Sequence, residues 1–126
     1  MKDFIQSRVR SFGYAFAGWG RVLKYEPNTW IHAFVSVAVI VVAAWLRLPA
    51  RDWAVLLLTI VIVWTAEFFN TAIEAVVDLV SPDEHPLAKV SKDVSAAGVL
   101  LAAITAVLIG LLILGPPLWE KLQSLF

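Results

Sequence analysis

The stretch from Trp53 to Val80 reads "WAVLLLTIVIVWTAEFFNTAIEAVVDLV" and decides the fold class. Its uncharged part, Trp53 to Ala66, is about 14 residues long, which is about 21 Å of helix at 1.5 Å per residue. A bilayer core is about 30 Å thick and needs about 20 helical residues to cross. A membrane-spanning helix at this place must therefore continue through Glu67 and Asn70.

The composition of the whole chain favours a membrane protein. Of its 126 residues, 60% are hydrophobic and 16% are charged, whereas soluble domains average about 45–50% apolar and about 25% charged residues. We expect a single all-α membrane domain over residues 1–126. The chain has no cysteine, which excludes disulfides and thiol chemistry, and its net charge is zero. We expect no nucleic-acid partner.

Three membrane spans are predicted at residues 29–48, 53–80 and 92–115, the last of them stopping at Gly115-Pro116-Pro117. Residues 1–25 place apolar side chains at every third or fourth position, which predicts an amphipathic helix on the membrane surface. Seven Lys and Arg residues precede the first span or lie between the second and third, against three elsewhere. Because positive loops stay inside, we expect the N-terminus and the 79–93 loop on the cytoplasmic side of the inner membrane.

Four polar residues of the second span fall on one helix face. At 100° per residue, Glu67, Asn70, Glu74 and Asp78 lie at about 0°, 300°, 340° and 20°. Such a face must point toward other helices or a wet cavity, and ionisable residues inside a membrane are candidates for function. The alternatives are polar groups that only tie helices together and an ion path in a protein that is not an enzyme.

A divalent metal ion is the simplest partner for carboxylates that share one face. Oxygen ligands at a cytoplasmic face favour Mg²⁺, which usually binds through one or two carboxylates together with phosphates. Glu26, just before the first span, is expected at the same membrane face as Glu74. In the loop "SPDEHPLAKVSKD", Lys89 and Lys92 are suited to phosphate. Lys92 and Asp93 are expected where the third span begins, and a helix N-terminus favours anions.

Two segments, "EFFNTAIEAVVD" (67–78) and "HPLAKVSKD" (85–93), resemble the small bacterial integral-membrane lipid kinases, the diacylglycerol kinase and undecaprenol kinase family. The segment "SFGYAFAGWG" (11–20) and Glu26 fit the surface helix and the first acidic position of that family. The resemblance extends over nearly the whole chain. It implies a surface helix and three transmembrane helices in a homotrimer, with active sites between subunits. It also implies ATP as phosphoryl donor, Mg²⁺ as metal and a membrane lipid as acceptor.

The resemblance assigns a role to each candidate residue. Glu67 matches the general base, Glu26 and Glu74 match the ligands of the metal carried by ATP, and Asn70 matches an amide beside the base. Asp78 matches the last position of the motif at residues 67–78 and is expected to support the site. Positions that contact the nucleotide are matched by Tyr14, Glu26, Glu74, Asp83, Glu84, His85, Lys92 and Asp93.

Two questions have more than one answer: which lipid is the acceptor, and which arginine of the first helix serves as the family's basic contact. The segments "EPNTWIH" (26–32) and "HPLAKVSKD" resemble the undecaprenol kinase branch, which favours undecaprenol over diacylglycerol. Trp30 stands where many members have Arg, and it is expected to be an interfacial anchor. Ser7 stands where the family has a basic residue, so either Arg8 or Arg10 is expected to serve.

Overall fold

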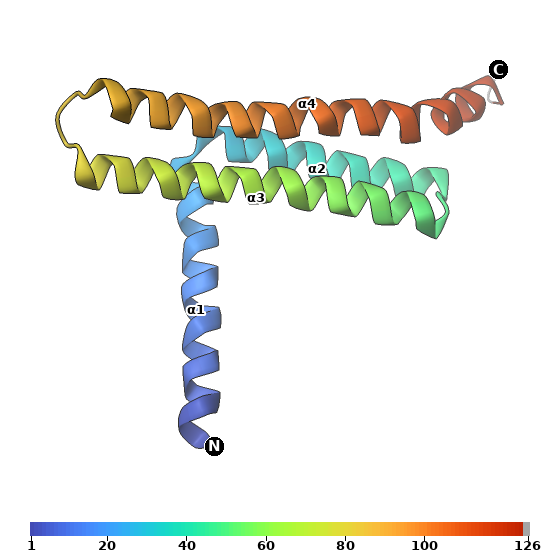
Figure 1. The fold of residues 1–126 in the computed structure, drawn as a ribbon. Helices are drawn as coiled ribbons and strands as arrows, with labels where there is room; N and C mark the ends of the chain where they lie inside the picture. Colours follow the sequence, from blue (N-terminus) through green and yellow to red (C-terminus); the bar gives the residue numbers. More distant parts are fainter. Residues whose placement is uncertain (125–126) are drawn as a thin grey trace.

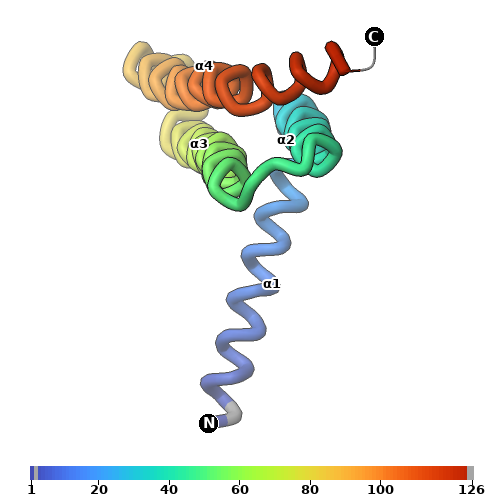
Figure 2. The backbone as a smooth tube through the Cα atoms, turned by 90° about the vertical axis from the view of Figure 1, so that its right-hand side faces the viewer, coloured from blue at the N-terminus to red at the C-terminus, as the bar shows by residue number. Residues whose placement is uncertain are grey.

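The computed structural model describes residues 1–124 and has four helices, α1 (Lys2–Tyr25), α2 (Pro27–Leu46), α3 (Ala50–Val80) and α4 (Pro86–Gln123). The helices α2, α3 and α4 run side by side, and α1 projects away from them (Figure 1). Viewed nearly along the bundle, the three long helices lie at the corners of a triangle (Figure 2). All three are long and apolar enough to cross a membrane. The prediction of an all-α chain with three helices that can span a membrane is confirmed.

The ends of α2 follow from local sequence. Pro27 occupies the first helical position, where its missing N–H costs no hydrogen bond and its fixed φ suits a helix. The helix ends at Arg47, whose φ of 53° and ψ of 48° are left-handed, a common way to terminate a helix. The predicted span 29–48 is therefore displaced by two residues at each end. The next helix, α3, begins at Ala50, directly after Pro49.

The helix that contains the third predicted span, 92–115, extends beyond the span at both ends. The helix α4 begins at Pro86, where the Leu87 amide donates to Nδ1 of His85 at 3.2 Å. It continues through Pro116 and Pro117. A proline inside a helix lacks one donor and bends the helix, and Figure 1 shows the last turns of α4 leaving the line of the rest. Two prolines thus bend this helix without ending it.

An aromatic cluster attaches the end of α1 to the bundle. The ring centroid of Trp19 lies 4.9 Å from that of Trp64 and 4.7 Å from that of Phe68. Val22, one turn later, is buried. Earlier apolar side chains of α1, such as Phe12 and Phe16, are exposed. The helix is thus held only near its C-terminal end.

The point where α1 joins the bundle divides α3 into two parts. Figure 1 shows α1 and the start of α2 meeting the bundle part of the way along α3, so that the ends of α3 and α4 and their loop extend beyond this junction. We call residues 77–93 the α3–α4 tip. The most extensive packing in the molecule is that of α3 against α4, and it supports this projecting tip.

Candidate active site

The polar face of α3 changes from buried to exposed along the helix. Glu67 is only 2% exposed, and Asn70 and Thr71 are also buried. Glu74, two turns after Glu67, is half-buried. The side chain of Asp78 is 65% exposed. The face therefore begins among the packed helices and ends in the open tip.

Glu67 faces α2. Its Oε2 lies 3.9 Å from Nε2 of His32, and its main-chain carbonyl accepts the hydroxyl of Thr71 at 3.0 Å. The His32 carbonyl in turn accepts the Ser36 hydroxyl at 2.7 Å, and the Ser36 oxygen accepts the indole N–H of Trp64 at 3.2 Å. These contacts hold the turn of α2 that carries His32 against α3.

Sequence reasoning did not place His32 or Ser36 in the site. Both are polar and lie four residues apart in an apolar helix, so they share one face. That spacing is the signal that could have revealed a polar face on α2 directed at the polar face of α3.

Asn70 connects α3 to α4 and positions Glu74. Its side-chain N–H donates to Oε1 of Glu74 at 3.1 Å, and its Oδ1 accepts the Ser95 hydroxyl at 2.7 Å. The same hydroxyl lies 2.9 Å from the Lys92 carbonyl. Asn70 therefore does tie helices together, which was the structural alternative for this residue, and it also orients a carboxylate. Ser95 was missed, although it is a polar side chain only three residues after Lys92.

Glu26 is the residue between α1 and α2, in extended conformation. Burial raises the pKa of Glu26 above 4.5, and the nearby carboxylates of Glu74 and Glu67 raise this pKa further, while a hydrogen bond from Thr71 lowers it. The loop between α1 and α2 thus brings Glu26 to the acidic face of α3. Repulsion among these carboxylates is what a bound cation would relieve.

The raised pKa of Glu26 predicts a pH-dependent effect of Glu26→Gln. A carboxyl with a raised pKa contributes stability below its unfolded value and loses it as pH rises through its folded value. The variant should therefore unfold at a higher temperature than the parent at about pH 7 without metal, and at the same temperature near pH 4. Circular dichroism melts in detergent with a chelator would test this, and an equal shift at both pH values would contradict it.

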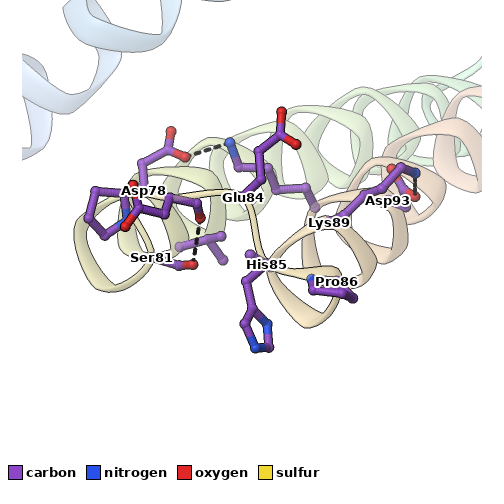
Figure 3. A pocket seen from close by; sticks show the side chains of 12 residues that line it. Asp78, Ser81, Glu84, His85, Pro86, Lys89 and Asp93 are labelled. Atoms are coloured by element: carbon purple, nitrogen blue, oxygen red, sulfur yellow. Dashed lines mark hydrogen bonds and ion pairs between the residues drawn. The ribbon is translucent and has the colours of Figure 1, made fainter.

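The α3–α4 tip encloses a pocket of about 740 Å³ between the end of α3, the connecting loop and the start of α4. It brings together the candidate residues Asp78, Asp83, Glu84, His85, Lys92 and Asp93, with Lys89 between them. Lys92 forms an ion pair with Asp78, and Lys89 forms another with Asp93 (Figure 3). Four carboxylates and two ammonium groups thus line the pocket.

Two details of the tip differ from expectation. The start of α4 at Pro86 puts Lys92 and Asp93 more than one turn inside the helix. The helix dipole acts mainly within the first turn. The prediction that Lys92 and Asp93 lie at a helix N-terminus that favours anions is therefore wrong. In Figure 3 the His85 ring points away from the carboxylates of Asp78 and Glu84, since its Nδ1 caps α4.

The candidate residues of α1 do not reach this pocket within one chain. Arg8, Arg10 and Tyr14 are exposed, and α1 projects sideways from the three long helices, whereas the tip lies at one end of them (Figure 1). The Arg8 guanidinium lies over the ring of Phe4, 5.2 Å from its centroid. Trp30 is also exposed.

The donor set suits a metal that arrives with phosphates. Residues 1–124 contain no group of three His, Cys, Asp or Glu side chains placed to hold a metal ion by themselves. Mg²⁺ needs only one or two protein carboxylates when phosphates supply the other ligands. Glu26 and Glu74, close enough to raise the pKa of Glu26, fit that requirement.

Comparison with known proteins identifies the family. Residues 13–114 match the sequence profile described as prokaryotic diacylglycerol kinase. A diacylglycerol kinase from Synechocystis is 50% identical over 109 residues, 86% of this chain and 62% of that protein. An undecaprenol kinase from Bacillus subtilis is 37% identical over 109 residues, 86% of this chain and 89% of that one. The diacylglycerol kinase of Escherichia coli is 31% identical over 100 residues, 79% and 82% of the two chains.

The chain therefore belongs to the prokaryotic diacylglycerol kinase family, as its sequence motifs predicted. The aligned region spans less than two thirds of the Synechocystis protein and most of the Bacillus and Escherichia proteins. Relatives in the family are named for two different lipids.

Proposed function

We propose that this protein is an ATP-dependent lipid kinase that phosphorylates the hydroxyl group of a membrane lipid. The observation that carries the proposal is the change along α3 from a buried carboxylate to an open, charged pocket. One helix holds a buried carboxylate, Glu67, among apolar helices and ends in a charged, open pocket at Asp78. An apolar acceptor and a water-soluble donor can thus approach two parts of the same helix.

Glu67 is the proposed general base. The lipid hydroxyl gives its proton to the Glu67 carboxylate, and its oxygen forms a bond to the γ-phosphorus of ATP. The bond from that phosphorus to the bridging oxygen breaks, and ADP leaves with the electron pair. Phosphoryl transfer requires mainly positioning and neutralisation of charge, so one base and a set of phosphate contacts are sufficient.

Glu26 and Glu74 are the residues that would hold Mg²⁺, which neutralises phosphate charge when bound. Asn70 supports this role because it holds Oε1 of Glu74 at 3.1 Å. Glu74 is half-buried between Glu67 and the tip, an intermediate place that suits a group between acceptor and nucleotide.

The pocket at the tip is the proposed nucleotide site. Lys92 and Lys89 are its phosphate-binding cations, and each forms an ion pair with an aspartate. Carboxylates outnumber the lysines around the pocket, so a triphosphate needs further positive charge. We propose that Arg8 or Arg10, with Tyr14, supplies contacts from a neighbouring subunit of a homotrimer.

The proposed setting is the inner membrane with α1 on its cytoplasmic surface. The exposed apolar residues of α1 support this, since they include Phe4, Phe12 and Phe16 with nothing covering them. Because α1 projects sideways from the three spans, a surface position for α1 leaves the spans free to cross the bilayer. The α3–α4 tip then extends toward cytoplasmic ATP.

Two acceptors compete in the proposal. Undecaprenol is supported by the segments "EPNTWIH" and "HPLAKVSKD" and by 37% identity to the Bacillus undecaprenol kinase over most of both chains. Diacylglycerol is supported by 50% identity to the Synechocystis diacylglycerol kinase. The proposed acceptor is undecaprenol, with diacylglycerol as the second candidate.

The test is phosphoryl transfer in mixed micelles with labelled ATP and Mg²⁺, offering each lipid separately. We expect label in undecaprenol and little in diacylglycerol, and no label in either with Glu67→Gln. Label in diacylglycerol alone would keep the kinase and change its acceptor. ATP left intact with both lipids would overturn the kinase, and ion flux dependent on the carboxylates would then favour the ion-path alternative.

A further inference from the structure

The first turn of α4 has little packing to hold it. Residues 81–93, all of which the structure describes, are exposed or half-buried. Segments with few buried apolar contacts open locally more easily than the rest of a protein. The first turn of a helix also has backbone N–H groups that find no partner inside the helix. Local hydrogen bonds at the start of α4 therefore decide how firmly this turn stays helical.

His85 makes two hydrogen bonds at the start of α4. Its carbonyl accepts the Lys89 N–H at 3.1 Å, and Nδ1 of its ring accepts the Leu87 N–H at 3.2 Å. Pro86, between His85 and Leu87, has no N–H to satisfy. The backbone of His85 is extended, with a φ of −131° and a ψ of 135°, which suits both an N-cap residue and a residue before proline. His85 thus caps α4 through its main chain and its side chain.

The side-chain bond determines the protonation state of the imidazole. Because Nδ1 accepts a hydrogen bond, it carries no hydrogen, and the ring is neutral with its hydrogen on Nε2. A protonated ring has a hydrogen on Nδ1 and cannot accept the Leu87 N–H. Its positive charge would also lie at the positive end of the helix dipole. The side-chain cap therefore exists only while His85 is neutral.

The two lysines of the tip pocket are held in different ways. Lys92 forms its ion pair with Asp78 of α3, so it is tied across two helices. Lys89 forms its ion pair with Asp93, which belongs to the same helix, so this pair does not fix Lys89 relative to α3. Lys89 follows His85 by four residues, about one helical turn. The place of Lys89 in the pocket therefore depends on the turn that His85 caps.

The ring of His85 does not reach toward the acidic groups of the pocket. His85 is among the residues that surround the pocket, yet its ring points away from the carboxylates of Asp78 and Glu84 (Figure 3). The ring can therefore affect a ligand in the pocket through the helix that it caps.

We propose that His85 is a positioning residue whose neutral ring, by capping α4, holds Lys89 in place for the phosphates of ATP. The inference rests on the proposed nucleotide site in the tip pocket. The role is indirect, and it differs from the direct nucleotide contact that the family resemblance assigns to His85. Without the cap, the first turn of α4 unwinds more often and Lys89 loses its fixed position. Binding of ATP then weakens, and binding of the lipid does not change.

The test replaces His85 with alanine, asparagine and glutamine and measures steady-state kinetics with whichever lipid the parent protein labels. His85→Ala removes the cap and should raise KM for ATP about three- to tenfold. Asparagine is a favoured N-cap, so His85→Asn should bring KM for ATP back to within about twofold of the parent. Glutamine reaches the Nε2 position but is not a favoured N-cap, so His85→Gln should resemble His85→Ala. None of the three should change KM for lipid.

Ser91→Ala is the matched control, because it removes another side-chain hydrogen bond near the start of α4. The Ser91 hydroxyl donates to the Leu87 carbonyl at 3.0 Å, and this bond caps no free N–H group. Ser91→Ala should keep the parent KM for ATP.

The double variant His85→Ala with Lys89→Gln tests whether His85 acts through Lys89. Residues that act through one another give effects that do not add. Lys89→Gln alone should raise KM for ATP, and adding His85→Ala should raise it by less than about twofold more.

The dependence on pH provides a further readout. Imidazole groups change charge between about pH 5 and 8, and protonation removes the cap. The ratio of KM for ATP in the parent to that in His85→Asn should therefore rise as the pH falls from about 8 to about 5.5. The parent and His85→Asn share the other charged groups around the pocket, so the ratio isolates His85. These groups are Asp78 of α3, Asp83 and Glu84 of the loop, and Lys89, Lys92 and Asp93 of α4.

Three results would overturn the inference: rescue by glutamine in place of asparagine, an unchanged KM for ATP in Lys89→Gln, or a ratio that does not depend on pH. If His85→Ala does not fold, His85→Gln takes its place as the variant without a cap, and its comparison with His85→Asn decides the matter. The proposed function fails in a different way. It fails if the parent labels neither lipid or if Glu67→Gln retains activity, whatever the His85 variants do.

Discussion

Replacing Glu67 with glutamine is expected to lower lipid phosphorylation by about 10²- to 10⁴-fold, the usual contribution of a general base. Glutamine has nearly the shape of glutamate and cannot take the hydroxyl proton. The position is 2% exposed, so water has little access to replace the lost base. The measurement is kcat for the preferred lipid in mixed micelles at saturating ATP.

The loss should occur without loss of folding. Removing a buried charge removes its desolvation cost, so the melting temperature of Glu67→Gln should equal or exceed that of the parent protein. Glu120→Gln is the matched control, since it makes the same chemical change at the exposed end of α4 and should keep full activity. Activity within tenfold of the parent would show that Glu67 is not the base.

The second large effect is expected at Glu74. Glu74→Ala removes a proposed metal ligand, and Asn70→Ala removes the amide that holds Glu74 Oε1 at 3.1 Å. Loss of a group that orients a metal ligand costs about 10- to 100-fold in affinity or activity. Asn70→Ala should therefore lose about 10- to 100-fold, and Glu74→Ala should lose more.

Titration with Mg²⁺ separates these two variants. Excess Mg²⁺ should partly restore Asn70→Ala, because the carboxylate is still present, and should not restore Glu74→Ala. Ser95→Ala removes the contacts of the Ser95 hydroxyl to Oδ1 of Asn70 and to the Lys92 carbonyl. It leaves the bond from Asn70 to Glu74 in place, so it should lose less activity than Asn70→Ala. Full activity of Glu74→Ala at low Mg²⁺ would remove this residue from the proposed metal site.

The spans and the polar face could be predicted because both depend on local pattern. Hydropathy over about 20 residues marks a span, and the 3.6-residue period places Glu67, Asn70, Glu74 and Asp78 on one face. Helix ends were harder to predict. Gly115-Pro116-Pro117 predicts a stop, yet α4 continues to Gln123. The start of the third span was predicted at residue 92, but α4 begins at Pro86, because a proline can occupy the first position of a helix.

Contacts between helices could not be predicted from the sequence pattern, because they join residues that are far apart in the chain. The Ser95 hydroxyl meets Asn70 across 25 residues of sequence, and His32 meets Glu67 from a different span. Either histidine could have been an ordinary turn or core residue. The structure makes His85 the cap of α4 and turns His32 toward a buried carboxylate.

The sequence by itself determined that this chain has three helices apolar enough to cross a membrane and which face of α3 is polar, because hydropathy and helical period are properties of neighbouring residues. Its motifs also determined the family. Only the tertiary structure decided that Glu67 is enclosed beside His32, that Asn70 holds Glu74 against α4, and that Asp78 opens into the tip pocket. These depend on how α2 and α4 pack on α3, and packing is settled by contacts between residues distant in the chain.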